Sequence, residues 1–161
     1  MKILIYTQCF APKFGGIESV MTNLAKQANL LKHDVTVLAD GSKHYTSIFD
    51  SKQKYKIYRF DQLKFLRKKI KSNFANDLCK EKKFDVAFFD SWKSLESFKS
   101  ENKIKKICLI HGNEILKLKK MKIILNSFKN VDGIIFNSIY TQNLFQKNFK
   151  KLNKNKYRII H

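Results

Sequence analysis

Residues 2–39 read KILIYTQCFAPKFGGIESVMTNLAKQANLLKHDVTVLA, and this stretch decides the fold. An apolar run at 2–7 predicts a buried strand, and a second run at 34–39 predicts another. Between them, apolar residues recur at steps of three or four from Ile17 to Leu31, which indicates one face of a helix. A strand, a helix and a strand in this order predict two parallel strands joined by a crossover helix.

The same alternation continues along the chain. Strand patterns follow at 55–60, 84–90, 106–110, 131–137 and 156–161, and helix patterns at 62–83, around 92–98, up to about 128, and at 139–149. The polar stretch 40–54 has no periodicity and predicts a surface loop. We therefore expect one α/β domain over residues 1–161, doubly wound, with a mostly parallel sheet of six to seven strands and helices on both faces.

The helix predicted at 62–83 combines an apolar stripe with basic residues on its other faces. The stripe consists of Leu63, Leu66, Ile70, Phe74 and Leu78, and the basic residues are Lys64, Arg67, Lys68 and Lys71. Such a helix either covers the sheet with a solvated basic face or lies on an anionic bilayer with its apolar residues half-buried. We favour the sheet-covering position.

The composition limits the partners and the compartment. A net charge of +20, almost wholly from lysine, favours anionic lipid, nucleic acid or phosphate-bearing substrates without choosing among them. The cysteines Cys9, Cys79 and Cys108 are widely spaced and form no C-x-x-C pair, which predicts neither a disulfide framework nor a zinc cluster. No apolar run approaches the ~20 residues of a membrane span. We expect a reduced, cytoplasmic protein with no metal.

Ligands of an open parallel sheet bind outside the carboxyl ends of its strands. Residues 8–16, 90–92, 111–114 and 137–140 follow predicted strands and are therefore the candidate site. Neither a pair of carboxylates at active-site spacing nor a cluster of metal ligands occurs among them.

Two of these groups have distinctive chemistry. The pair Gly15 and Gly16 opens a helix, where bare backbone and free N–H groups suit an anion such as a diphosphate, or where a tight turn needs positive φ. The pair is part of neither a G-x-G-x-x-G fingerprint nor a Walker A loop. His111 directly follows a strand, where it either donates to a phosphate or orients a hydroxyl, or else serves the structure alone.

Four segments, in this order, carry a resemblance to a known family. The opening stretch has the Pro-containing loop, Gly-Gly-hydrophobic-Glu and a His-acidic-Val strand, and it is followed by FDVAFFD at 84–90, ICLIHGNE at 107–114 and VDGIIFNSIYTQNLF at 131–145. Together they resemble the N-terminal domain of the retaining family 4 (group 1) glycosyltransferases of GT-B fold. The resemblance covers essentially the whole chain.

The resemblance implies a fold of two Rossmann-like domains that face each other, with the acceptor held by the N-terminal one and the nucleotide-sugar by the C-terminal one. It places Gly15 and Gly16 against the donor diphosphate and gives His111 the role of positioning the transferred sugar. The residues it places along the cleft or the acceptor are Phe10, Glu18, Asp90, Ser91, Asn113, Glu114, Ser138 and Tyr140. It implies transfer with retention of configuration, without a metal or other cofactor.

Two departures from the family pattern affect these expectations. Lys32 stands where the family has a glycine before the histidine, which predicts a different or strained helix end. The donor-binding domain, with its two glutamates seven residues apart, would follow His161, where this sequence ends. We therefore expect an acceptor-side half, inactive alone, that is an isolated domain, a truncated gene product or one half of a split enzyme with a separate donor-domain chain.

The expected partners are a nucleotide-sugar, a saccharide or lipid-linked acceptor such as a cell envelope polysaccharide precursor, and an anionic membrane at whose inner face the protein is peripheral. One alternative is a non-catalytic basic module that binds nucleic acid or anionic membrane. We disfavour nucleic acid, because the aromatic-basic motifs of the common RNA-binding folds are missing. A nucleotide-dependent oxidoreductase or hydrolase is also disfavoured, because its glycine fingerprint and nucleophile motif are missing.

Overall fold

A computed structural model describes residues 1–100, 103–112, 120–149 and 157–159 of the chain. A seven-stranded sheet in the order β3-β2-β1-β4-β5-β6-β7 forms its centre, and every neighbouring pair of strands is parallel. The order reverses direction at β1, between β2 and β4, which is the arrangement of a doubly wound sheet. The predicted α/β domain and its parallel sheet are confirmed.

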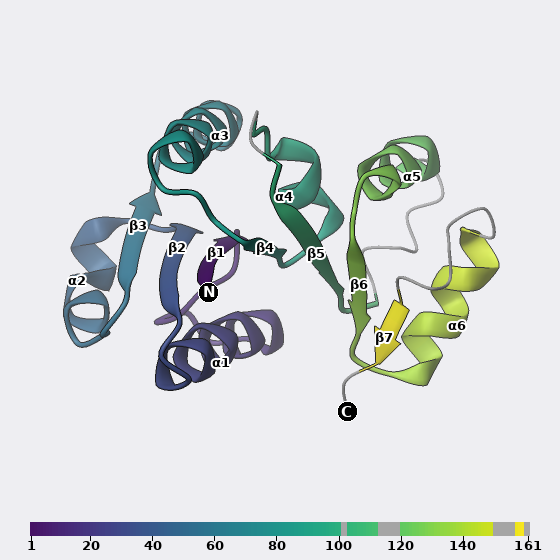
Figure 1. Cartoon of the computed structure of the whole chain (residues 1–161), viewed down its shortest axis with the longest axis horizontal. Helices are drawn as coiled ribbons and strands as arrows, with labels where there is room; N and C mark the ends of the chain where they lie inside the picture. The colour runs from purple at the N-terminus through teal and green to yellow at the C-terminus, as the bar shows by residue number, and fades with distance from the viewer. Residues whose placement is uncertain (101–102, 113–119, 150–156, 160–161) are drawn as a thin grey trace.

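The elements alternate along the chain as the sequence predicts (Figure 1). The strands are β1 Lys2–Thr7, β2 Asp34–Asp40, β3 Lys56–Phe60, β4 Val86–Phe89, β5 Lys105–Ile110, β6 Gly133–Phe136 and β7 Tyr157–Ile159. The helices of the described residues are α1 Gly16–Leu30, α2 Lys43–Ser51, α3 Lys64–Glu81, α4 Trp92–Ser97, α5 Met121–Lys129 and α6 Ile139–Asn148.

The sheet separates two apolar layers, because successive side chains of a strand point to opposite faces. In β1, Ile3 and Ile5 pack with Met21 and Ala25 of α1, whereas Leu4 and Tyr6 belong to the larger layer on the other face. Figure 1 shows α3, α4 and α5 along one side of the sheet and α1 and α2 on the other, with α6 beside β7. Burial on both faces explains why the strands are nearly continuous apolar runs.

The end of α1 contains the backbone feature that Lys32 predicts. Lys32 has φ of 62°, in the left-handed region that favours glycine. The N–H of Lys32 donates to the carbonyl of Asn29 (2.9 Å) and that of His33 to the carbonyl of Ala28 (3.1 Å). These two bonds are those of a Schellman motif, so the helix end is the usual one and the lysine adopts a glycine conformation within it.

The surface loop predicted at 40–54 is wrong, because residues Lys43–Ser51 form α2. The helix has few apolar residues, so its periodicity is weak. Its inner side combines one apolar contact with polar ones: Phe49 packs against the core with its ring centroid 6.3 Å from that of Phe10, and Asp50 pairs with the buried Arg59. A single inward aromatic residue and an ion pair do not produce the apolar periodicity by which a helix is predicted.

The orientation predicted for the helix at 62–83 is also partly wrong. The buried residues of α3 are Lys71, Ser72, Ala75 and Cys79. Phe74 and Leu78 pack beside the core as predicted, but Leu63, Leu66 and Ile70 are exposed. The first half of α3 therefore directs a lysine inward and apolar side chains outward. None of the helices in the described ranges is long and apolar enough to cross a membrane.

Candidate functional site

The loop after β1 is held in place by the carboxylate of Asp90, which directly follows β4. Asp90 Oδ2 accepts hydrogen bonds from the Thr7 hydroxyl (2.8 Å) and from the backbone N–H groups of Gln8 (2.7 Å) and Cys9 (3.1 Å). Its side chain is buried, so the carboxylate faces these donors and not a ligand. In the described chain Asp90 therefore positions the loop after β1, and its place along a cleft stays a prediction.

A second group of contacts fixes the loop from the side of α1 and β3. The N–H of Ala11 donates to the Thr22 hydroxyl (3.1 Å), and the Arg59 guanidinium donates to the Ala11 carbonyl and pairs with Asp50 (2.7 Å). Phe10 lies beneath this arginine with its ring centroid 5.4 Å from the guanidinium carbon and is 1% exposed. The ring of Phe10 thus belongs to the core under the loop, and its predicted place along the cleft stays a prediction.

The glycine pair follows this anchored loop at the start of α1. Gly15 is the N-cap and is extended, with φ of 165°, and neither Gly15 nor Gly16 has a φ in the left-handed region that favours glycine. A Cβ on Gly16 would have no described non-neighbouring atom within 4 Å, and one on Gly15 would meet the flexible carboxylate of Glu18. Neither backbone conformation nor crowding within the described chain requires these glycines, so the turn interpretation is wrong.

Two further strand ends bring His111 and Ser138 to the same edge of the sheet. β5 and β6 are hydrogen-bonded neighbours, and His111 and Asn137 come directly after them. The Asn137 side-chain amide donates to the His111 carbonyl (3.4 Å), and Gly112 has φ of 118°, which glycine alone adopts readily. Ser138 caps α6 by accepting a hydrogen bond from the Thr141 N–H (3.1 Å), as its sequence position predicts.

The remaining candidates differ in accessibility. Tyr140 is 75% exposed, Ser91 and Glu18 are partly exposed, and Ser91 precedes α4 as its N-cap residue. Asn113 and Glu114 lie outside the described residues. In the portion of the chain that the structure describes, no group of three or more histidine, cysteine or acidic side chains is placed to hold a metal.

A hollow between the ends of β1 and β2 and the first half of α3 completes this edge, and sequence reasoning missed it. It contains about 320 Å³ of space open to solvent and is lined by Tyr6, Gln8, Asp40, Lys64, Arg67, Lys68, Lys71 and Ser97. The Tyr6 hydroxyl lies 3.3 Å from that of Ser97. Asp40 is the last residue of β2, and its position at the carboxyl end of a strand could have indicated this site from the sequence. Lys71 of α3 was missed because the helix pattern placed it on the outer faces.

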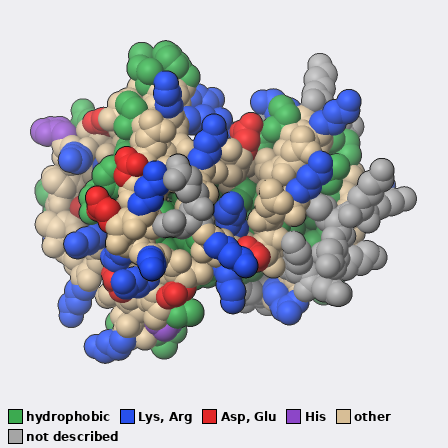
Figure 2. Space-filling view, turned by 45° about the horizontal axis from the view of Figure 1, so that its top comes forward, with side chains coloured by type: hydrophobic (Ala, Val, Ile, Leu, Met, Phe, Trp, Pro, Cys, Tyr) green, Lys and Arg blue, Asp and Glu red, His purple; other side chains and the backbone are tan. Residues whose placement is uncertain are grey.

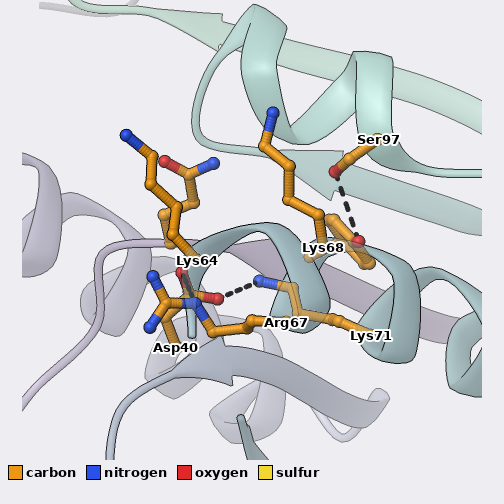
Figure 3. Close-up of a pocket in the computed structure, with 8 residues that line it drawn as sticks. Asp40, Lys64, Arg67, Lys68, Lys71 and Ser97 are labelled. Carbon is orange, nitrogen blue, oxygen red and sulfur yellow. Dashed lines mark hydrogen bonds and ion pairs between the residues drawn. The ribbon is translucent and has the colours of Figure 1, made fainter. Parts of the chain in front are cut away.

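Charge differs across this edge. Asp40 pairs with Lys71 (2.7 Å) and Arg67 (3.0 Å), and burial lowers the pKa of Lys71 against the opposing effect of Asp40 (Figure 3). In the loop, by contrast, burial raises the pKa of the Cys9 thiol to about 12, with further contributions from Asp90 and Glu18. The edge therefore has a cationic part at α3 and a part beside carboxylates at the loop.

The comparisons with known proteins agree on the class of this fold and site. The family model of Glycosyltransferase Family 4 matches residues 14–161, and the chain belongs to this family. No curated protein sequence matches the chain.

Solved structures of similar fold include three glycosyltransferase-class proteins. Sucrose-phosphate synthase from Thermosynechococcus elongatus aligns over 99% of this chain and 48% of its own, with a TM-score of 0.77 and 10% identity. The lipopolysaccharide outer core galactosyltransferase WaaB aligns over 98% of this chain and 44% of its own, with a TM-score of 0.67 and 16% identity. Anabaena HepE, solved with UDP and glucose, aligns over 100% of this chain and 44% of its own, with a TM-score of 0.64 and 18% identity. The chain thus spans about half the length of these GT-B structures and has the fold of one half.

Proposed function

We propose that this chain is the acceptor-side half of a retaining glycosyltransferase, which transfers a sugar from a nucleotide-sugar to a saccharide or lipid-linked acceptor. The observation that supports this most is the family match over 148 residues, 14–161, because those residues include every predicted strand end after the first. The UDP and glucose bound to HepE favour a UDP-sugar as the donor. No metal or cofactor is part of the proposal.

The proposed roles follow from what each group can do at the carboxyl edge of the sheet. His111 donates a hydrogen bond to a hydroxyl of the transferred sugar and so fixes its orientation. Gly16 lets the donor diphosphate approach the backbone N–H groups at the start of α1, since no described side chain occupies the space over it. Ser91, Ser138, Tyr140 and Glu18, with Asn113 and Glu114, are proposed to contact the sugars from around these two points.

The test is a transfer assay with a panel of radiolabelled UDP-sugars, with this chain alone and together with a donor-binding half from the same family. We expect product only in the mixture, and at least a hundredfold less product with His111→Ala. His33→Ala is the matched control, because His33 lies between α1 and β2 at the opposite edge. Transfer by the chain alone, or equal loss in both variants, contradicts the proposal.

We also propose that the protein docks on an anionic membrane through α3, at the cytoplasmic face. Leu63 and Phe65 are 70% and 71% exposed, and Leu66 and Ile70 are 43% and 41% exposed. Figure 2 shows hydrophobic side chains gathered with basic ones at the top of the molecule, where Figure 1 places α3. Apolar side chains beside lysines are the chemistry that binds an anionic bilayer surface.

Sedimentation with vesicles tests this docking. Vesicles with about a third anionic lipid should bind the chain, and vesicles of neutral lipid should bind it far more weakly. Leu63→Ser with Phe65→Ser should reduce binding on the order of tenfold, because two apolar side chains no longer enter the bilayer. Leu30→Ser with Leu31→Ser is the control, since both leucines are 69% exposed at the end of α1. Equal loss in the two double variants contradicts this surface.

A further inference from the structure

The hollow beneath α3 has an unusual excess of positive charge for its size. Among the residues that the structure describes, four cations, Lys64, Arg67, Lys68 and Lys71, line it together with one carboxylate, Asp40. Asp40 already serves two of them, through Oδ1 to Lys71 and Oδ2 to Arg67. Nearby Asp90 adds negative charge, but its carboxylate is directed at the three donors of the loop after β1.

The two lysines at the mouth are available to a ligand. Figure 3 shows the ammonium groups of Lys64 and Lys68 extending away from Asp40, while Arg67 and Lys71 converge on it. Lys68 has only a 3.7 Å contact with the exposed Glu96, and Lys64 makes no ion pair with any residue that the structure describes. Such exposed pairs contribute little and are readily exchanged for another anion.

The inner end of the hollow is formed by Lys71 and its fixed contacts. Lys71, whose side chain is 3% exposed, donates to the Thr7 carbonyl (2.6 Å) and to Asp40, and its Nζ lies 4.5 Å from the centre of the Tyr6 ring. The hydroxyl groups of Tyr6 and Ser97 also line the hollow, where that of Ser97 donates to the Ser94 carbonyl (3.0 Å) and that of Tyr6 lies 3.3 Å from Ser97 Oγ. A buried cation that shares one carboxylate with an arginine is stabilised further by a second anion.

We propose that this hollow binds a phosphate group carried by the acceptor. A phosphate ester is chosen because its charge of nearly two matches the two lysines, Lys64 and Lys68, that do not contact Asp40, and because its three free oxygens can accept from several ammonium groups at once. The hollow is open to solvent, so the sugar or glycerol attached to the phosphate would extend out of it. This inference rests on the proposed acceptor-side function, whose substrate class it narrows.

Calorimetric titration with inorganic phosphate and with glucose 6-phosphate, at low ionic strength, tests the proposal on the chain itself. We expect saturable binding that weakens at least tenfold in the double variant Lys64→Gln, Lys68→Gln. Lys69→Gln is the matched control, an exposed lysine of the same helix that does not line the hollow. Unchanged thermal unfolding confirms the fold of each variant. Equal weakening in the control, or no binding, overturns the proposal.

A second arm distinguishes a soluble phosphate ester from a lipid headgroup. Vesicles of phosphatidylcholine with about a third phosphatidic acid are compared with vesicles containing the same fraction of phosphatidylserine. A preference for phosphatidic acid that Lys64→Gln, Lys68→Gln abolishes assigns the phosphate to a lipid, and binding of glucose 6-phosphate alone assigns it to a soluble acceptor. Failure of both overturns the hollow as a phosphate site. Absence of sugar transfer with phosphate binding intact contradicts only the proposed transferase function.

Discussion

The loop of residues 8–16 and the hollow under α3 flank the same end of β1, yet their electrostatics are opposite. The loop lies beside Asp90 and Glu18, whose charges help to raise the pKa of Cys9. The hollow has four cations and one carboxylate. Opposite local charge at two neighbouring places indicates that they meet different parts of a substrate. The hollow suits a free anionic group, and the loop suits groups that approach the backbone closely.

The largest expected effect concerns Cys9. Because burial and then the charge of Asp90 raise its pKa to about 12, the thiolate fraction at pH 8 is on the order of a thousandfold below that of a thiol with a pKa of 9.0. Iodoacetamide should therefore alkylate Cys9 about a thousandfold more slowly than it alkylates the chain in urea. Glu18→Gln should raise the rate. Modification of Cys9 at the rate of an exposed thiol contradicts the burial of this thiol beside Asp90 and Glu18.

Removing the charge of Asp90 should disorganise the loop. In Asp90→Asn, the oxygen that accepts all three hydrogen bonds from Thr7, Gln8 and Cys9 loses its negative charge, so these charge-assisted bonds weaken and the free energy of unfolding should fall by about 2–3 kcal/mol. Urea unfolding followed by circular dichroism measures this change. Asp61→Asn, at an exposed position, is the control and should leave stability unchanged. A loss equal in the two variants would mean that Asp90 does not anchor the loop.

Lys71→Met should reduce the free energy of unfolding by about 2 kcal/mol, because Asp40 loses one partner but keeps Arg67, and the Thr7 carbonyl loses its donor. Lys69→Met, on the exposed side of α3, serves as the reference. Burial lowers the pKa of Lys71 in the folded chain below 10.5, the value of a lysine in the unfolded chain. At pH values between the folded and the unfolded pKa, the unfolded chain therefore binds more protons than the folded one. The stability difference between wild type and Lys71→Met should therefore increase as the pH rises toward 10.5.

The smallest expected effect concerns the C-terminal end of α1, which belongs to neither the loop nor the hollow. Lys32→Gly should stabilise the protein by about 1 kcal/mol, since glycine adopts the φ of 62° without steric strain. Lys26→Gly, at an exposed position inside α1, should destabilise it by a similar amount. Thermal unfolding compares the two. Destabilisation by both substitutions would contradict the left-handed conformation, and phosphate binding should be unchanged in each.

The sequence predicted the strands and the sheet because buried parallel strands are continuous apolar runs. It also predicted Ser138 as an N-cap, because capping is a local property. It failed for α2 and for the first half of α3, where contacts with distant residues decide the packing. Lys71 faces inward because Asp40 and Thr7 meet it there, 31 and 64 residues away along the chain. The sequence placed Phe10 and Asp90 at the carboxyl edge of the sheet, where they lie. It did not predict that both side chains are buried, because Arg59 covers Phe10 and the loop after β1 covers Asp90.

A titration of the ¹⁵N-labelled chain with inorganic phosphate, followed by two-dimensional NMR, tests the division of this edge most directly. We expect the first and largest shifts at Gln8, Lys64, Arg67, Lys68 and Lys71, with little change at Gly15, Gly16 and Ile17 at the same phosphate concentration. The double variant Lys64→Gln, Lys68→Gln should remove these shifts. Shifts that begin at Gly15–Ile17, or that are spread evenly over exposed lysines such as Lys26 and Lys80, would contradict this division of the edge.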